Sequence, residues 1–386
     1  MSTVFEKNRC CGCSACSKIC PVGAITMIED EEGFLYPEIN QDKCIQCGAC
    51  HKICAFNTQT EKQEIGAVYA VQNKDEQLRN KATSGGFFHI IASYIIENGG
   101  VVYGAVLNED LVVEHQRSEK QEELEKFYGS KYVQSDLRKI YEPLLRDIKE
   151  NRLILFTGTP CQVAEIKQYC QKYNGNVEKL ITCDFVCHGV PSKKIFDEHI
   201  QFLEKKYKKK IISYKFRTKE LGWKGHHEKA IFEGESNTDE KNRKYIDIYK
   251  ELYGSLNIIR PSCYECPYAK SEHISDITMG DFWGIENYEE EFKDNKGTSF
   301  VMVNSEQGKE IFEELKKDMF YKEERIDICR NPQLKGPTNR PKNRERFWNE
   351  YFSKGYKYIA KKYTTYGLVK KARVTAYQIL KKMKLK

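Results

Sequence analysis

The sequence predicts a small, cysteine-rich α+β domain followed by a larger α/β domain. Two observations lead to this fold class. The first 57 residues of the 386-residue chain hold two cysteine runs of one design. From residue 66 onward, short apolar runs alternate with amphipathic helical segments, a pattern typical of α/β domains. The polar stretch 58–64 between them is predicted to be a linker.

The two cysteine runs match the bacterial two-cluster ferredoxin signature. They are Cys10, Cys13, Cys16 and Cys20 with Pro21 after it, then Cys44, Cys47, Cys50 and Cys54. In such domains three thiolates of each run bind one [4Fe-4S] cluster and the fourth binds the other cluster. Disulfides would need an oxidising compartment, and zinc prefers two cysteine pairs on a longer loop. We therefore predict a ferredoxin-like domain over residues 1–57 with two [4Fe-4S] clusters.

Composition suggests where the protein works. The first residues show no basic segment followed by an apolar stretch, so we expect a cytoplasmic, reducing environment. No window approaches eighteen consecutive apolar residues, so we expect no membrane span. The formal charge of +7 comes from one end, because residues 354–386 hold eleven Lys or Arg and no Asp or Glu. We predict a basic tail over 346–386 behind a mildly acidic body.

The basic tail also carries apolar groups. They are Tyr356, Tyr358, Ile359, Tyr363, Tyr366, Leu368, Val369, Tyr377, Ile379 and Leu380. Cations interleaved with such groups suit the headgroup region of an anionic membrane, so one hypothesis is peripheral contact with the inner face of the membrane. A helix docked on the acidic body is an equal alternative. Nucleic acid ranks lower because no recognition motif is present.

In the large domain, predicted over residues 65–345, the apolar pattern places the elements. Helical spacing predicts a helix over 87–95, and apolar runs predict strands at 100–107, 152–157 and 179–187. A helix follows the second of these strands, with Pro160 in its first turn. Further strands are expected near 211–216, 274–279 and 299–303.

One glycine-containing loop is a candidate anion site. Thr83-Ser84-Gly85-Gly86 precedes the helix predicted over 87–95, so its amides and the helix dipole can receive a phosphate. Gly-Gly before a helix is also a common turn, which is the competing interpretation. Lys131 is a further candidate phosphate contact, although the chain contains many lysines.

Four later cysteines form a candidate metal site. Cys161 lies in a first helical turn, Cys187 ends a strand, and Cys263 and Cys266 have metal-ligand spacing. Because strand ends and helix starts gather at one edge of an α/β sheet, these thiols can converge on one centre. The alternative is that the first two are buried apolar groups and the pair binds zinc or nothing. Cys170 and Cys183 are predicted core residues, whereas Cys11 and Cys329 have no assigned partner.

Two side chains are candidate catalytic residues. Asp281 follows a predicted strand, in Gly280-Asp281-Phe282-Trp283-Gly284, and would lie at the ligand edge of the sheet. His188 is adjacent to Cys187 and is a candidate proton donor. The competing interpretations are a turn aspartate and a solvated loop histidine.

Together these motifs resemble the coenzyme F420-reducing hydrogenase beta-subunit family, in its version fused to a two-cluster ferredoxin. The resemblance covers residues 1 to about 340. It rests on Thr83-Ser84-Gly85-Gly86, Ser130-Lys131-Tyr132, Gly158-Thr159-Pro160-Cys161-Gln162, Cys187-His188-Gly189-Val190-Pro191, Cys263-x-x-Cys266-x-Tyr268, Ser275-Asp276-Ile277 and Gly280-Asp281-x-Trp283-Gly284.

The resemblance implies FAD in the large domain and an iron-sulfur cluster beside it. It favours Cys161, Cys187, Cys263 and Cys266 as ligands of a third [4Fe-4S] cluster. It also favours the loop from Thr83 to Gly86 as a flavin contact. Lys131, Gly158 and Thr159 complete the predicted cofactor contacts.

Clusters carry single electrons and a flavin converts them into two-electron chemistry, so the combination predicts a reductase. The leading hypothesis is an FAD-dependent iron-sulfur oxidoreductase. It would take electrons from a low-potential donor such as ferredoxin and reduce a small or lipid-linked organic substrate, with surface-polysaccharide synthesis as one context. The alternatives are an electron-transfer subunit without its own substrate and a deazaflavin (coenzyme F420) reductase.

Overall fold

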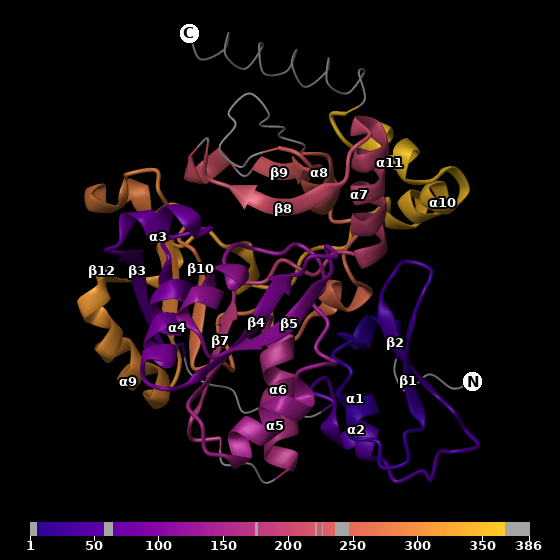
Figure 1. Cartoon of the computed structure of the whole chain (residues 1–386), viewed down its shortest axis with the longest axis horizontal. Coiled ribbons are helices and arrows are strands. Elements are labelled where there is room, and N and C mark those ends of the chain that lie inside the picture. Colours follow the sequence, from indigo (N-terminus) through magenta and orange to yellow (C-terminus); the bar gives the residue numbers. More distant parts are fainter. Residues whose placement is uncertain are drawn as a thin grey trace.

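The computed structural model describes residues 6–57, 65–173, 177–220, 222–225, 227–235 and 247–366. Its N-terminal domain contains an antiparallel pair of strands and two short helices (Figure 1). The strands are β1 (Ile25–Glu29) and β2 (Leu35–Ile39), and the helices are α1 (Ala15–Lys18) and α2 (Ala49–Ile53). Each helix holds the third cysteine of one run, so the repeat in the sequence is also a repeat in the structure.

An eight-stranded mixed sheet forms the centre of the large domain, in the order β12-β3-β11-β10-β7-β6-β4-β5. The bounds are β3 (Ala67–Asn73), β4 (Val101–Leu107), β5 (Val113–Ser118), β6 (Ile154–Thr157), β7 (Leu180–Phe185), β10 (Ile277–Asp281), β11 (Ser299–Val303) and β12 (Met319–Glu324). The four strands β10, β7, β6 and β4 are parallel, and the outer strands pair antiparallel.

The parallel centre agrees with the sequence prediction, because its strands are continuous apolar runs. All four residues of β6 are buried, as a strand covered on both faces requires. The antiparallel strands β3, β5 and β12 were not predicted, so the α/β expectation is corrected to a mixed sheet. The carboxyl ends of β6, β7 and β10 meet at one edge, where ligands bind in open sheets of this kind.

Helices cover both faces of the sheet. Helices α4 (Phe87–Glu97) and α9 (Glu306–Leu315) share a core with one face, and α5 (Tyr141–Lys149) and α6 (Pro160–Lys172) share a core with the other. Helix α3 (Glu76–Lys81) follows β3. Because α6 starts directly after β6, its first turn lies at the carboxyl edge of the sheet.

A separate layer lies above that edge in Figure 1. It consists of the hairpin β8 (Ile211–Thr218) and β9 (His227–Phe232) with four helices, which share one apolar core. The helices are α7 (Lys193–Tyr207), α8 (Ile248–Gly254), α10 (Arg344–Lys354) and α11 (Tyr356–Tyr363). The strand predicted near 211–216 thus belongs to this hairpin and not to the main sheet.

The structure corrects the prediction that residues 346–386 form a tail. Helix α11 buries Tyr356, Ile359 and Ala360 against α7 and α8. The ring of His199 on α7 makes a 2.6 Å hydrogen bond to the Tyr356 hydroxyl. Residues up to 366 are therefore part of the body, as the docked-helix alternative predicts. Leu368, Val369, Tyr377, Ile379 and Leu380 lie outside the described residues.

The N-terminal domain packs against α5 and α6 (Figure 1) and shares their core. Tyr141 on α5 donates its hydroxyl to the Cys13 carbonyl at 2.8 Å, and Tyr268 donates to the Ala55 carbonyl at 2.7 Å. These bonds hold the first cysteine run and the end of the second run against the large domain. Among the described residues, no helix is long and apolar enough to cross a membrane.

Candidate redox site

The backbone of both cysteine runs has the conformation expected of a cluster site. Gly12 and Ser14 flank the second cysteine of the first run with φ of 69° and 74°. Gln46 and Gly48 flank the second cysteine of the other run with φ of 55° and 72°. Left-handed residues next to right-handed ones turn successive N–H groups inward and form nests that bind anionic groups, iron-sulfur clusters included. Both runs therefore fit the predicted [4Fe-4S] clusters.

The fourth cysteines lie near the opposite runs. Burial raises the pKa of Cys54 to about 12, and repulsion from Cys10 of the first run adds to this shift. Burial also raises the pKa of Cys50, with repulsion from Cys47 and from Cys20 of the first run. This proximity agrees with the predicted exchange of fourth ligands. We call the site of Cys10, Cys13, Cys16 and Cys54 the inner cluster site, and that of Cys20, Cys44, Cys47 and Cys50 the outer cluster site.

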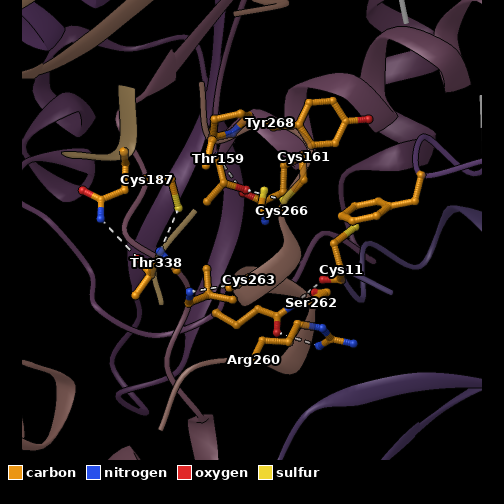
Figure 2. Close-up of a pocket in the computed structure, with 18 of the residues that line it drawn as sticks. Cys11, Thr159, Cys161, Cys187, Arg260, Ser262, Cys263, Cys266, Tyr268 and Thr338 are labelled. Carbon is orange, nitrogen blue, oxygen red and sulfur yellow. Dashed lines mark hydrogen bonds between the residues drawn. The ribbon is translucent and has the colours of Figure 1, made fainter. Parts of the chain in front are cut away.

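The four later cysteines meet in one cavity of about 40 Å³ (Figure 2). Cys161 comes from the first turn of α6, Cys187 from the loop after β7, and Cys263 and Cys266 from the segment before β10. The carboxyl ends of β6 and β7 place Cys161 and Cys187 at one edge of the sheet. The segment before β10 brings Cys263 and Cys266 to them, and the Val190 amide donates to the Cys263 Sγ at 3.4 Å. The structure thus brings together the four thiols that the sequence singled out.

Burial gives these thiols a shared property. It raises the pKa of both Cys263 and Cys266 to about 12, so the thiols are protonated at neutral pH unless a metal displaces the protons. Among the described residues, no three His, Cys, Asp or Glu side chains are arranged to hold one metal ion. A [4Fe-4S] cluster binds its four cysteines through four separate irons, so its ligands need not meet at one point. The donor set fits such a cluster.

Cys11, to which the sequence assigned no role, lines the same cavity. A hydrogen bond with Cys11, together with burial, raises the pKa of the Cys161 thiol. The cavity therefore has a fifth thiol, which comes from the N-terminal domain. Cys170 and Cys183 are fully buried core residues as predicted, and Cys329 is also buried.

A second cavity, of about 680 Å³, lies against the first. This volume is within the range of about 300–1,000 Å³ that is usual for cofactor and ligand sites. Most predicted flavin contacts and both candidate catalytic residues line it, namely Thr83, Ser84, Gly86, Lys131, Gly158, Thr159, His188 and Asp281. Its wall is mainly apolar. Predicted site residues that lie between positions 83 and 281 of the sequence therefore line one cavity, which is large enough for a flavin.

The loop from Thr83 to Gly86 is held firmly at the start of α4. Ser84 donates its hydroxyl to the Thr298 carbonyl at 2.9 Å, and the Lys219 ammonium donates to the carbonyls of Arg79, Ser84 and Lys296. Gly85 is enclosed, since a Cβ there would lie 2.2 Å from the Val71 carbonyl oxygen. The loop thus presents Thr83, Ser84 and Gly86 to the cavity, while Gly85 allows the close packing behind it.

Lys131 lines the cavity, but its ammonium is already engaged. It donates to the carbonyls of Lys126, Phe127 and Tyr128 at 3.3, 2.8 and 2.9 Å. Burial lowers the pKa of Lys131 to about 7. The side chain therefore shapes the loop 126–131, and its ammonium is not a free phosphate ligand in this conformation.

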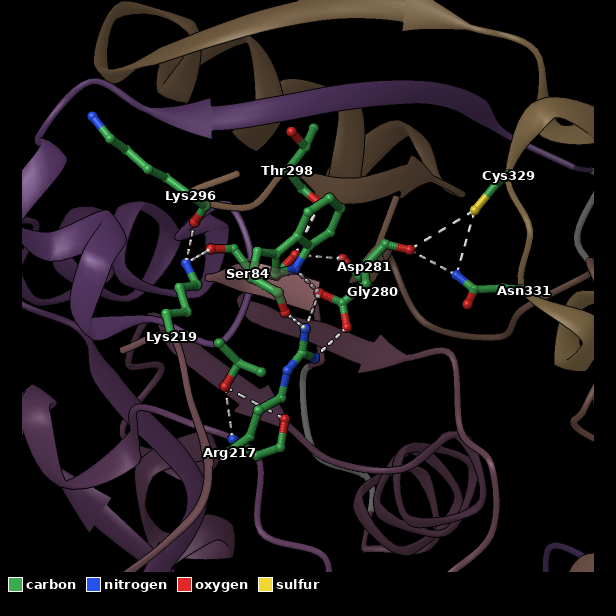
Figure 3. Close-up of polar contacts among 12 residues, drawn as sticks. Ser84, Arg217, Lys219, Gly280, Asp281, Lys296, Thr298, Cys329 and Asn331 are labelled. Carbon is green, nitrogen blue, oxygen red and sulfur yellow. Dashed lines mark hydrogen bonds and ion pairs between the residues drawn. The ribbon is translucent and has the colours of Figure 1, made fainter. Parts of the chain in front are cut away.

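Asp281 is likewise engaged in a network (Figure 3). Its carboxylate accepts hydrogen bonds from Arg217 at 2.5 Å and from the Trp223 indole at 2.8 Å. The Trp223 ring stacks on Trp283 with centroids 4.5 Å apart, and the Arg217 guanidinium lies 5.3 Å from the Trp283 ring centroid. This arrangement builds one wall of the cavity, so Asp281 acts as a structural anion there.

His188 lies on the cavity wall beside Cys187. Burial lowers its pKa, so the imidazole is neutral at pH 7. Sequence reasoning missed Arg217 and His115, which also line the cavity. Arg217 is on β8, far along the chain from its partner, and the sequence carries no spacing signal that would reveal the pair.

Two family models match parts of the chain. Residues 151–328 match the family model for the C terminus of the coenzyme F420 hydrogenase/dehydrogenase beta subunit, and residues 9–58 match a 4Fe-4S dicluster domain. No curated protein matches the sequence. A chain of the F420-reducing [NiFe] hydrogenase complex from Methanosarcina barkeri, studied after xenon derivatization, aligns with a TM-score of 0.48 and 15% identity, over 76% of this chain and 94% of that one.

Proposed function

We propose that the chain is an iron-sulfur flavoprotein reductase, on the premise that residues 151–328 match the model for the C terminus of the coenzyme F420 hydrogenase/dehydrogenase beta subunit and residues 9–58 match a 4Fe-4S dicluster domain. The inner and outer sites hold two [4Fe-4S] clusters, and Cys161, Cys187, Cys263 and Cys266 hold a third. FAD occupies the 680 Å³ cavity. Bound there, a flavin would collect single electrons and release them as a pair.

One observation carries this proposal: the two cavities share a wall. Thr159, Gln162, Cys187, Gly189 and Val190 line both of them. A cofactor in the large cavity would therefore be in contact with residues that hold the thiol site. The N-terminal domain reaches the same thiol site through Cys11. This arrangement supports a continuous route from the cysteine runs to the large cavity.

The chain's own residues define the two ends of that route. Cys47 of the outer site is exposed, whereas every cysteine of the inner site is buried or partly buried. A low-potential donor such as ferredoxin would therefore meet the outer site first. At the other end, the rigid loop after Thr83 and the neutral His188 orient the occupant of the cavity, and His188 can donate a hydrogen bond to it from its ring N–H.

A part of the large cavity supports a substrate of its own. Lys250 and Tyr253 of α8, with Arg217 of β8, line the side contributed by the hairpin layer. None of these residues is a predicted cofactor contact, so this side suits an organic acceptor. Deazaflavin is one acceptor, suggested by the name of the matching family, and a lipid-linked sugar of surface-polysaccharide synthesis is another. An electron-transfer subunit would instead need its flavin at an open surface.

Anaerobic purification followed by iron, sulfide and flavin analysis tests the proposal. We expect about twelve irons and one FAD per chain, because three cubanes hold four irons each. Cys266→Ser should lower the iron content to about eight, whereas Cys170→Ser, in the core, should keep it unchanged. About eight irons in the unmutated protein, or zinc bound at Cys263 and Cys266, would contradict a third cluster.

A matched pair of variants tests the flavin site. Ala105 lines the large cavity, and Ala67 is an exposed residue of the same sheet. Ala105→Trp should fill the cavity and lower the FAD content while iron stays unchanged. Ala67→Trp introduces the same residue elsewhere and should leave both unchanged. Equal FAD content in the two variants would show that flavin does not bind in this cavity.

A further inference from the structure

Arg260 joins the thiol site to the inner cluster site. Its backbone precedes the short turn Pro261–Glu265, which carries Cys263, and its carbonyl accepts the Cys263 amide at 3.0 Å. Its side chain is fully buried and extends into the N-terminal domain. There it donates to the Cys10 carbonyl at 2.5 Å and to the Leu35 carbonyl at 2.7 Å.

The guanidinium also contacts sulfur. Its Nη2 lies 3.6 Å from the Sγ of Cys10, a predicted ligand of the inner cluster. Gly12 makes this approach possible, because a Cβ at that position would lie 2.7 Å from Nη1 of Arg260. The rings of Tyr36 and Phe34 enclose the cation, with centroids 4.4 and 5.4 Å from its Cζ.

Within the described part of the chain, no carboxylate pairs with this buried cation. Among the described residues, the hydrogen-bond partners of Arg260 are two carbonyls, the Cys10 sulfur and the amide oxygen of Gln134. Two comparable buried arginines do have carboxylate partners, Arg217 with Asp281 and Arg344 with Glu32. Because an unpaired charge is costly to bury, an anion at the inner site would stabilise the buried Arg260 cation. Four thiolates around a cubane supply that anion.

We propose that Arg260 is the buried countercharge of the inner cluster and raises its reduction potential above that of the outer cluster. The potential of a cluster depends on its charge environment, its hydrogen bonds and its exposure. Arg260 donates to a sulfur of the inner site, whereas among the described residues no arginine or lysine donates to Cys44, Cys47 or Cys50 of the outer site. One electron would then leave the reduced outer cluster and reach the oxidised inner cluster in the favourable direction, toward the thiol site.

The inference rests on the dicluster domain and on the inward route of the proposed function, but its readout requires no flavin. Anaerobic potentiometry followed by paramagnetic resonance measures each cluster separately, and Cys47→Ala, which removes an outer ligand, assigns the signals. In the unmutated protein the inner cluster should be reduced first. If the outer cluster is reduced first, the proposal is overturned, whatever the flavin content.

Charge variants test the role of Arg260 itself. At a fixed ambient potential, Arg260→Gln should lower the ratio of reduced to oxidised inner cluster about tenfold or more, which is about 59 mV for one electron. Arg260→Lys keeps the positive charge, so its ratio of reduced to oxidised inner cluster should stay close to that of the unmutated protein. Arg344→Gln breaks a clamp at the same interface away from the inner-site sulfurs and should leave it unchanged.

Three results would refute the role. The first is an unchanged ratio of reduced to oxidised inner cluster in Arg260→Gln at full iron content. The second is an equal shift of this ratio in Arg344→Gln. The third is a decrease of the ratio in Arg260→Lys as large as that in Arg260→Gln. If Arg260→Gln fails to retain the inner cluster, the order of reduction in the unmutated protein and the Arg260→Lys measurement still decide the question.

Discussion

Asp281→Asn is expected to destabilise the large domain, because Asp281 is the counterion of a buried arginine. The Arg217 side chain is 2% exposed and that of Asp281 is 16% exposed, with 2.5 Å between Nη1 and Oδ2. Removing one partner of a buried ion pair leaves the other charge uncompensated, which typically costs about 3–5 kcal/mol. Asparagine can still accept the Trp223 indole bond, so the substitution mainly removes the charge.

Two measurements follow the change. Thermal unfolding should show a midpoint lowered by roughly 6–20 °C, using about 2–4 °C per kcal/mol for a domain of this size. Near-ultraviolet circular dichroism reports on the stacked indoles of Trp223 and Trp283 and should lose amplitude in the variant. Asp327→Asn, which removes the partner of Arg325 in an exposed pair, is the control and should behave like the unmutated protein.

A double variant isolates the charge. Combining Asp281→Asn with Arg217→Met removes the unpaired cation, so the pair of changes should cost less stability than Asp281→Asn alone. Two results would contradict this role: a free energy of unfolding of Asp281→Asn within about 1 kcal/mol of that of the unmutated protein, or a double variant that is less stable than Asp281→Asn alone. Asp281 would then not be a structural anion, and it would again be a candidate catalytic residue.

Three further predictions follow from other parts of the chain. Cys20→Ser should damage the outer cluster and spare the inner one, which paramagnetic resonance of the variant can show; loss of the inner signal would exclude the exchange of fourth ligands. Burial lowers the pKa of His199 to about 3 from about 6.5 in the unfolded chain, so the unfolded state binds more protons and stability falls as the pH drops below about 6.5. Between pH 6.5 and 5, the fall in the free energy of unfolding, measured with denaturant, should be about 2 kcal/mol smaller in His199→Gln than in the unmutated protein. An equal fall in the two proteins would contradict this prediction. Deleting residues 367–386 should abolish cosedimentation with phosphatidylserine vesicles at low salt and leave iron unchanged, whereas equal binding to neutral vesicles would reject membrane contact.

Local patterns in the sequence located the cysteine-rich sites. The spacing of Cys10 to Cys54 identified the cluster domain, and strand ends placed Cys161 and Cys187 at one edge of the sheet. Both inferences need only short-range information, namely ligand spacing and the direction of parallel strands. The loop from Thr83 to Gly86 was found in the same way, as a helix start.

Contacts between distant parts of the chain were not predictable. Arg260 meets Cys10 across 250 positions, and Arg217 meets Asp281 across 64. Nothing in the local sequence distinguishes these arginines from the exposed ones. The position of Lys131 was identified, but the carbonyls that engage its ammonium depend on the fold of loop 126–131. The basic composition of residues 354–366 also concealed the apolar face of α11, which the packing on α7 reveals.

The rate of flavin reduction tests the central claim most directly. Anaerobic stopped-flow mixing with reduced ferredoxin, or with dithionite, would follow bleaching of the flavin absorbance in the unmutated protein and in Cys266→Ser. We expect rapid bleaching in the unmutated protein, and FAD retained but reduced at least tenfold more slowly in the variant. Absence of FAD from the unmutated protein, or equal rates in the two proteins, would contradict a route from the clusters through the thiol site to the large cavity.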